Sequence, residues 1–407
     1  MKELLRKLVQ AETTATTGEL AAAKVISDEL GRSGITARID NWDQTRANVI
    51  AQVKSPAFGG SDQAGLRPGR KAALLFACHL DVVGPGEGEW KYPPFGGIES
   101  DGRIYGRGSA DMKGGIAAIV TATRQLVEAG TRLQGDIIFL AAAGEETDSC
   151  GAKRFIRDCN WLPGLAGVVI PEPTDFKVVT AHRGMLWLEV TTKGKAAHGS
   201  TPQLGVNAIS SMRCILDELE NYKIPFEPHP APIERSRASG LGVPKSWSIG
   251  SSIGAGLGEC SMSINTIAGG KALNVVPDKC SIGIDIRTLP SQNHQDIISD
   301  LEKIFGKLKS KNPQFDAKVS VIRGVEPLET DNRCYFVKDF CAAVGATKTK
   351  AVGFTTDGPC FAPLGAPVVI FGPGKPEVCH KPDEYIEISD VEKAVEHYKN
   401  IILKFLS

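Results

Sequence analysis

The sequence predicts an α/β protein with a mostly parallel sheet and an inserted α+β part. Three observations lead to this prediction. Apolar runs that suit buried parallel strands alternate with helical patterns towards both ends of the chain. The middle of the chain instead alternates polar and apolar residues with period two, as one-sided antiparallel strands do. The chain has 407 residues, which is long for one core and favours two domains.

The outer segments supply the elements of the α/β part in order. Buried strands are expected at 72–78, 137–143, 168–170 and 367–371, and helices at 18–34, 112–130 and 389–406. A loop rich in Gly, Pro and Ser is expected from 55 to 69. Alternation of these strands and helices along the chain indicates a parallel sheet covered by helices.

The inserted segment fits a ferredoxin-like domain. Strands at 187–192, 280–287 and 317–321 and helices at 207–219 and 297–308 are compatible with a β-α-β-β-α-β order. We therefore predict an inserted dimerisation or lid domain at 182–325 and a catalytic domain at 1–181 and 326–407. The segment 225–258 is expected to be a long loop. A small antiparallel sheet exposes an edge strand, so a C₂ homodimer through the inserted domain is expected to cover that edge.

Composition excludes several classes of function. Basic and acidic residues each number 47, so the zero net charge favours neither nucleic acid nor a membrane surface as a partner. No apolar run approaches the roughly 18 residues that span a bilayer, and the first seven residues lack a signal-peptide core. The ten cysteines lack paired spacing, which favours free thiols in a reducing cytoplasm.

Chemically capable side chains follow each expected buried strand of the α/β part. They are His79 and Asp81, then Glu145 and Glu146, then Glu172, and finally His380, while Asp111 opens a helix. Sites in open α/β sheets lie past the carboxyl ends of the strands, so these side chains are expected to converge on one edge. Adjacent side chains at a strand exit point in different directions. One of the two adjacent glutamates can therefore hold a metal while the other faces the water bound to it.

Each of these residues alone has a plainer explanation. The glutamate pair could be a charged turn, Asp81 a turn cap, Asp111 a helix cap and His380 a loop histidine. Their joint placement favours two zinc ions that share a bridging carboxylate and a water. Zinc-bound water has a pKa of about 7, so a hydroxide nucleophile would be available at neutral pH. Asp81 could accept the second ring N–H of His79 and fix its tautomer.

A series of motifs now resembles the dinuclear-zinc exopeptidase and deacylase family. In chain order they are His79-Leu80-Asp81, Gly108-Ser109-Ala110-Asp111-Met112-Lys113-Gly114-Gly115, Gly144-Glu145-Glu146, Pro171-Glu172-Pro173-Thr174, Gly194–Pro202, Asn274–Asp278, Asp285-Ile286-Arg287 and Cys379–Glu384. The resemblance covers nearly the whole chain. Glu172 and Gly372-Pro373-Gly374 make it most similar to the branch of acetylornithine deacetylase and succinyl-diaminopimelate desuccinylase.

The resemblance implies a role for each residue of the motifs. His79 and Glu172 would hold one zinc ion, Glu146 and His380 would hold the other, and Asp111 would bridge the two. Glu145 would be the general base, and Asp81 the outer partner of His79.

The resemblance also implies functional residues in and near the inserted domain. His198 resembles the histidine that reaches the site of a neighbouring subunit and stabilises the tetrahedral oxyanion. Asn274 and Arg287 resemble substrate-contacting positions. Thr355 begins a segment that only partly matches the substrate loop of the family, which leaves the substrate open.

The predicted function is metal-dependent hydrolysis of an N-acylated amino acid by a metal-bound hydroxide. The resemblance implies two zinc ions per subunit, with cobalt as a possible substitute, and a role in amino-acid biosynthesis. A dipeptidase or carboxypeptidase of the same family is the alternative. A catalytically dead binding protein on this fold is a third reading, but it predicts a lost base or ligand, and every expected position is filled.

Overall fold

The computed structural model describes residues 1–55, 73–225 and 257–407. The chain divides into two compact units. The first unit contains Met1–Thr180, Thr330–Lys350 and Thr356–Ser407, and the second contains Ala181–Glu329 and Ala351–Thr355. Most of the two expected loops, at 55–69 and 225–258, lies outside the described residues.

A mixed sheet of nine strands is the main sheet of the described residues. Its order is β1-β2-β6-β3-β7-β15-β8-β13, and β14 also pairs with β8. The strands are β1 Ala37–Asn41, β2 Ala47–Val53, β3 Ala73–His79, β6 Ile137–Ala142, β7 Leu165–Ile170, β8 Val179–His182, β13 Leu328–Glu329, β14 Lys350–Val352 and β15 Val368–Ile370. The central strands β6, β3, β7 and β15 are parallel neighbours, which confirms the predicted mostly parallel sheet.

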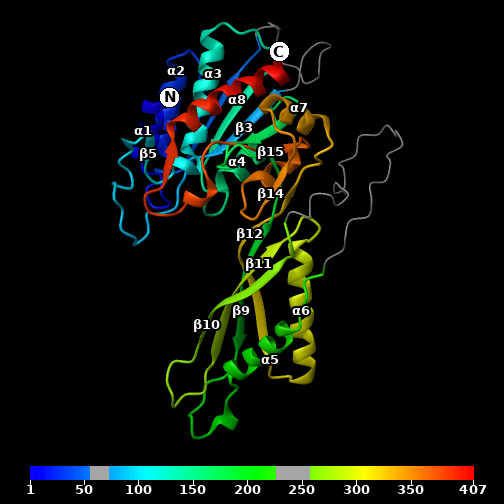
Figure 1. Cartoon of the computed structure of the whole chain (residues 1–407). Helices are drawn as coiled ribbons and strands as arrows, with labels where there is room; N and C mark the ends of the chain where they lie inside the picture. The colour runs from blue at the N-terminus through cyan, green and yellow to red at the C-terminus, as the bar shows by residue number, and fades with distance from the viewer. Residues whose placement is uncertain (56–72, 226–256) are drawn as a thin grey trace, which may run out of the picture. The chain divides into compact units, whose positions relative to one another are not determined.

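Continuous apolar sequence explains why these central strands lie inside the first unit. Every residue of β3 and of β6 is buried, as expected for strands covered on both faces. Helices α3 (Gly114–Glu128) and α8 (Ile388–Leu406) pack against each other and against β3, and Figure 1 shows them side by side. The remaining helices of this unit are α1 Lys2–Gln10, α2 Leu20–Gly31, α4 Cys150–Asp158 and α7 Tyr335–Val344.

A small three-stranded sheet joins two distant parts of the first unit. Its order is β16-β5-β4, with β4 at Ile98–Ser100, β5 at Arg103–Tyr105 and β16 at Tyr385–Glu387. β16 is antiparallel to β5, with Tyr385 opposite Tyr105. Since β5 runs towards Asp111 and β16 runs away from His380, this pairing brings the two residues to the same end of the sheet.

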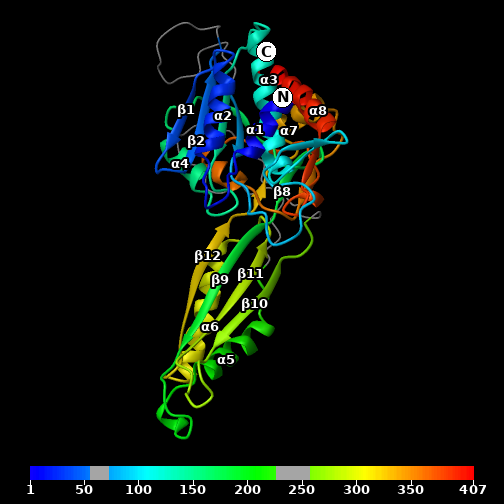
Figure 2. The same cartoon turned by 90° about the vertical axis from the view of Figure 1, so that its left-hand side faces the viewer.

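The second unit has the predicted ferredoxin-like order. β9 (Gly184–Lys193), α5 (Ala208–Glu220), β10 (Ser261–Gly269), β11 (Lys279–Thr288), α6 (His294–Lys311) and β12 (Asp316–Val325) follow one another along the chain. The strands form an antiparallel sheet in the order β10-β11-β9-β12. Figure 2 shows both helices on one face, where Leu188, Ile284, Ile215 and Leu301 contribute to a buried core.

Candidate metal centre

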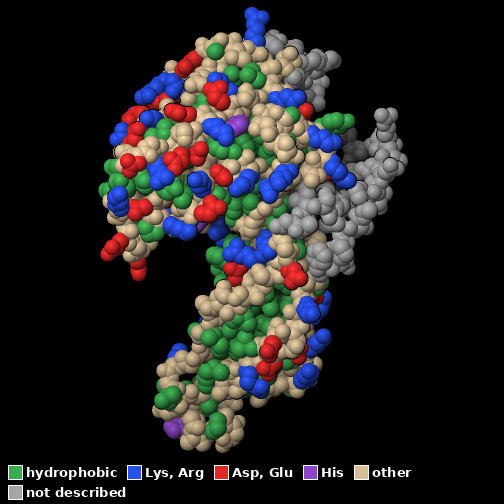
Figure 3. Space-filling view, viewed as in Figure 1, with side chains coloured by type: hydrophobic (Ala, Val, Ile, Leu, Met, Phe, Trp, Pro, Cys, Tyr) green, Lys and Arg blue, Asp and Glu red, His purple; other side chains and the backbone are tan. Residues whose placement is uncertain are grey.

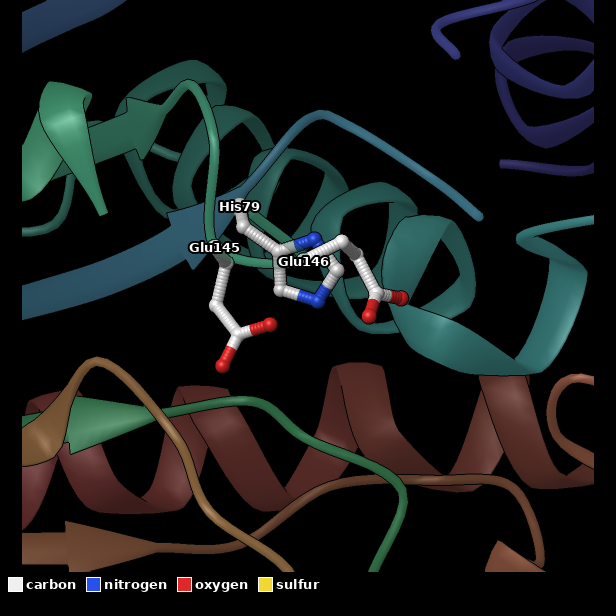
Figure 4. Close-up of side chains that lie close together, drawn as sticks. All are labelled: His79, Glu145 and Glu146. Carbon is white, nitrogen blue, oxygen red and sulfur yellow. The ribbon is translucent and has the colours of Figure 1, made fainter. Parts of the chain in front are cut away.

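The predicted site residues of the first unit lie just past the carboxyl ends of the parallel strands. His79 is the last residue of β3, and Glu172 follows β7 by two residues. Glu145 and Glu146 follow β6 after Gly144, whose φ of +81° and crowded surroundings require glycine. This tight turn places the two glutamates on different sides of the His79 ring, as Figure 4 shows.

Three side chains form the first candidate ligand group. Nε2 of His79 lies 3.1 Å from Oδ1 of Asp111 and 3.5 Å from Oε1 of Glu172. The candidate ligand atoms of these residues all lie within 4.8 Å of one another. His79 and Glu172 are buried, so these groups face one another away from bulk solvent.

A second candidate group shares Asp111 with the first. Nε2 of His380 lies 3.2 Å from Oδ2 of Asp111 and 2.9 Å from Oε1 of Glu146. The two carboxylate oxygens of Asp111 therefore face two different histidines. Asp111 lies in the turn Ser109–Lys113, and no side-chain hydrogen bond caps that turn or α3. The geometry fits a bridging carboxylate better than a helix cap.

The distances between these donor atoms fit two zinc ions. Two ligands that each lie about 2.0–2.1 Å from a tetrahedral zinc ion are roughly 3.3 Å apart. The four donor pairs around Asp111 span 2.9 to 3.5 Å. The donor set of imidazole nitrogens and carboxylate oxygens also suits zinc, cobalt or manganese. A third group combines His79 with Glu145 and Glu146, so Glu145 too lies within reach of a cation.

Electrostatics favour the same conclusion because acidic groups outnumber the two imidazoles. Burial and the nearby Asp111 raise the pKa of Glu172 to about 8. Hydrogen bonds to Asp111 and Glu146 raise the pKa of His380 to about 10. Burial opposes protonation of His79, yet Glu172 and Asp111 hold its pKa well above the usual value. The site therefore attracts positive charge, which divalent cations would supply.

Asp81 acts differently from the sequence expectation. Nδ1 of His79 lies 3.0 Å from the backbone carbonyl oxygen of Asp81 and 3.7 Å from the carboxylate oxygen Oδ1. The buried carboxylate instead accepts the backbone N–H groups of Gly144, Glu145 and Glu146, at 2.8, 3.0 and 2.9 Å. The carbonyl thus orients the imidazole, while the carboxylate holds the turn that carries both glutamates.

Glu145 has the surroundings of a group that can accept a proton. Its side chain is buried. Burial raises its pKa well above the usual carboxyl value; His79 opposes this shift and Asp357 adds to it. A raised pKa brings a carboxylate closer to the range in which it works as a general base at neutral pH. Sequence analysis missed the buried Asp357, which lies two residues beyond Thr355 in the expected substrate loop.

Two of the predicted functional residues of the second unit, His198 and Asn274, lie next to each other. His198 pairs with Val275 in an isolated bridge, and the N–H of Gly199 donates to the carbonyl of Asn274 at 2.7 Å. His198 and Asn274, which are distant along the chain, are therefore neighbours, and both are exposed. The backbone N–H of Ser200 donates to Nδ1 of His198, so a neutral ring carries its proton on Nε2.

Arg287 and Thr355 also belong to the second unit. Arg287 donates from Nε and Nη2 to the two carboxylate oxygens of Asp285, at 2.9 and 3.0 Å. Thr355 is half-buried.

Two buried charged residues beside the site were absent from the predicted set. Arg107 donates from Nη1 to Oε2 of Glu384 at 2.6 Å, and both side chains are buried. Glu384 is the last residue of the motif that contains His380, and Arg107 directly precedes the motif that contains Asp111. Their charges at these positions were the available signal in the sequence.

A comparison with protein families matches residues 75–404 to Peptidase family M20/M25/M40. The chain belongs to this family. A probable succinyl-diaminopimelate desuccinylase of Staphylococcus aureus (strain MSSA476) is 30% identical to this M20 chain in an alignment 428 residues long, which covers 99% of this chain and 97% of the relative. An acetylornithine deacetylase of Proteus mirabilis (strain HI4320) is 28% identical over 416 residues, covering 99% and 96%.

Solved structures share the M20 fold. The metallo-carboxypeptidase Sso-CP2 of Sulfolobus solfataricus superposes with a TM-score of 0.74 at 20% identity, over 98% of each chain. The YXEP protein of Bacillus subtilis, described as a dinuclear metal-binding peptidase, has a TM-score of 0.67 at 15% identity, over 99% of this chain and 96% of that one. The family match and the relatives named as a desuccinylase and a deacetylase make the chain a hydrolase of a metal-dependent family.

None of the described helices is long and apolar enough to cross a bilayer.

Proposed function

We propose that this M20 hydrolase uses two zinc ions to remove the acyl group from an N-acylated amino acid. The observation that carries the proposal is the position of Asp111, whose two oxygens face His79 and His380 at 3.1 and 3.2 Å. The relatives named as a desuccinylase and a deacetylase support an acyl-amino-acid substrate. The two names refer to an N-succinyl and an N-acetyl derivative of a diamino acid.

In this proposal each side chain of the centre has one task. His79 and Glu172 would hold one ion, Glu146 and His380 would hold the other, and Asp111 would contribute one carboxylate oxygen to each position. When bound, the ions would supply Lewis acidity and a water whose pKa is near 7. Glu145 takes a proton from the attacking water and delivers it to the amide nitrogen of the leaving amino acid. The backbone carbonyl of Asp81 holds the tautomer of His79 throughout.

We further propose that the second unit forms a homodimer and lends His198 to the site of the partner. β10 is an edge strand, and almost every residue of it is exposed. Apolar side chains are exposed on β10, on α5 and in neighbouring loops, and they include Ile264, Ile267, Ile209, Leu204, Leu273 and Val275. Hydrophobic side chains gather over the strands of this unit in Figure 3. Pairing with a second copy would cover this edge.

We also propose that the protein works in the cytoplasm. All ten cysteines lie in the described residues, and all ten are free thiols. Free thiols fit a reducing cytoplasm, where synthesis of amino acids would take place.

Peptide hydrolysis is the second candidate function. The neighbours of known structure include human carnosine dipeptidase 1, which has a TM-score of 0.65 at 19% identity. Both reactions cleave an amide beside a carboxylate, so the metal ligands cannot separate them. The deciding experiment measures kcat/KM on N-acetylornithine, N-succinyl-diaminopimelate and a set of dipeptides, with zinc and then cobalt supplied. The proposal expects an acylated amino acid to exceed every dipeptide; the reverse order would make the protein a dipeptidase.

A further inference from the structure

Glu384 is a buried carboxylate that contacts the backbone of the proposed bridging residue. Its Oε1 accepts the N–H of Ala110 at 3.0 Å and the N–H of Asp111 at 3.2 Å. The side chain of Glu384 is fully buried. It follows His380 by four residues, so one short segment both supplies a candidate ligand and holds the backbone of another.

Arg107 fixes the orientation of this carboxylate. Its Nη1 donates to Oε2 of Glu384 at 2.6 Å and to the carbonyl oxygen of Lys381 at 3.3 Å. The guanidinium also lies over the ring of Trp90, 5.1 Å from its centroid. With Arg107 on one oxygen and two backbone N–H groups on the other, Glu384 has a single orientation available.

The hydrogen bonds of Glu384 connect the segment that contains Asp111 with the segment that contains His380. Antiparallel pairing of β5 with β16 aligns the chain before Asp111 with the chain after His380. The N–H of Gly106 donates to the carbonyl of Glu384 at 2.8 Å, which extends that alignment towards the site. Beyond this point the hydrogen bonds of Glu384 join the two segments at Ala110 and Asp111.

We propose that Glu384, oriented by Arg107, is a positioning residue that sets the distance between Asp111 and His380 and thereby the affinity of the second metal position. The inference rests on the proposed function, because it takes Asp111 as the bridging ligand. Groups that hold metal ligands in place typically change metal affinity about 10–100-fold when they are altered. The hydrogen bonds of Glu384 at this turn go to the backbone N–H groups of Ala110 and Asp111, so we expect its effect to pass through the backbone of Asp111.

If Glu384 only stabilised the fold, losing another ion pair between β5 and β16 should lower metal affinity to the same extent. The chain offers a matched control in Arg103 and Glu387, which face each other on β5 and β16. Nε of Arg103 donates to Oε1 of Glu387 at 2.8 Å. This pair joins the same strands but is partly exposed and makes no hydrogen bond to the turn that carries Asp111.

The test compares Glu384→Gln with Glu387→Gln and with wild type in the full-length protein. Zinc is titrated against a chromophoric chelator, and native mass spectrometry counts the bound ions. We expect two ions in wild type and in Glu387→Gln. In Glu384→Gln we expect the weaker-bound ion to lose affinity by at least tenfold, while kcat falls more than KM rises.

Each other outcome counts against one of the claims. Two ions bound by Glu384→Gln within threefold of wild-type affinity would overturn the inference and leave the proposed function intact. An equal loss in Glu387→Gln would also overturn it, because the effect would then be general destabilisation. Fewer than two ions in wild type would overturn the proposed function and the inference together. If Glu384→Gln does not fold, Glu384→Asp takes its place, since it keeps the charge beside Arg107 but is shorter by one methylene.

Discussion

Arg287 and Asp285 form a bidentate ion pair, with two hydrogen bonds, on the same face of β11. Nε and Nη2 of Arg287 lie 2.9 and 3.0 Å from the carboxylate oxygens of Asp285. The Nε–Nη2 edge of the guanidinium is thus occupied by an internal carboxylate, while the N–H groups of Nη1 belong to its other edge. A substrate would have to share Arg287 with Asp285 or replace it.

This relationship gives a first prediction for Arg287→Lys. Lysine keeps the charge but loses the planar fork, so KM for a substrate with a free carboxylate should rise about tenfold or more, with kcat much less affected. Asp285→Asn removes the competing charge and should not raise KM. Steady-state kinetics of both variants make the comparison. An unchanged KM in Arg287→Lys would mean that Arg287 serves only its partner Asp285.

The second prediction concerns Glu145→Gln. Glutamine keeps the shape of the side chain but cannot accept the proton, so kcat should fall roughly 10²–10⁴-fold. Metal content, measured by elemental analysis, should stay at two ions per chain. The adjacent variant Glu146→Gln serves as the contrast, because it should lose metal. Loss of metal from Glu145→Gln instead would identify Glu145 as a ligand.

The third prediction concerns Asp111→Ala. Removal of the residue between the two histidines should empty or cripple both metal positions, because each ion loses one ligand at once. Elemental analysis and activity should fall together. If Asp111 were only a helix cap, the change would cost about 0.5–2 kcal/mol of stability, and the metal content would remain at the wild-type level.

A fourth prediction tests whether His198 acts in the partner subunit. His198→Ala and Glu145→Gln should each be nearly inactive alone. When the two proteins are mixed and exchange subunits, a mixed dimer regains one complete site, so activity should return to a substantial fraction of wild type. Nε2 of His198 carries the proton in the neutral ring and is the proposed donor to the oxyanion. Absence of recovery despite measured subunit exchange would assign His198 to its own subunit or to no catalytic role.

The fifth prediction concerns stability and pH. Burial lowers the pKa of His182, on β8, to about 4. The folded protein therefore binds fewer protons than the unfolded chain between pH 4 and the unfolded value of about 6.5. Stability from this residue is complete above pH 6.5 and is lost as the pH falls towards 4.

The variant His182→Asn removes this titration and keeps a donor near the carbonyl of Arg183, which the wild-type ring contacts at 2.7 Å. Urea unfolding of both metal-free proteins gives the measurement. The stability advantage of wild type should shrink by roughly 2 kcal/mol between pH 7.5 and pH 5. A constant difference over this range would show that His182 does not titrate in this way.

The strands that carry the candidate metal centre could be predicted because each is a continuous apolar segment in the sequence. β3 and β6 are short, continuous apolar runs; His79 ends β3, and Glu145 and Glu146 follow shortly after β6. Because sites in such sheets lie past the carboxyl ends of the strands, these side chains were expected to lie close together, and the structure places them within one cluster. The ferredoxin-like order of the second unit was predicted for a similar reason, since β11 alternates with a strict period of two.

Contacts between segments far apart in the chain, and the atoms that make a given contact, were harder to predict from the sequence. β5 and β16 have three residues each, and their pairing depends on segments far apart in the sequence, so neither strand was predicted. The sequence placed Asp81 beside His79, but it could not show that the carbonyl oxygen of Asp81, 3.0 Å from Nδ1 of His79, lies closer than the carboxylate oxygen at 3.7 Å. The ion pair between Asp285 and Arg287 did have a signal, since residues two apart on a strand share a face.

The pairing of β5 with β16 also bears on how the enzyme matures during synthesis. Arg107 and Glu384 are 277 residues apart, so closing the loop between them is a late event for a chain made from its N-terminus. His79, Asp111 and Glu172 would leave the ribosome long before His380 and Glu384. A nascent chain would therefore pass through a stage with one half of the cluster present and an excess of acidic groups. The second candidate ligand group, which includes His380, would therefore be complete only after the C-terminal segment has been made.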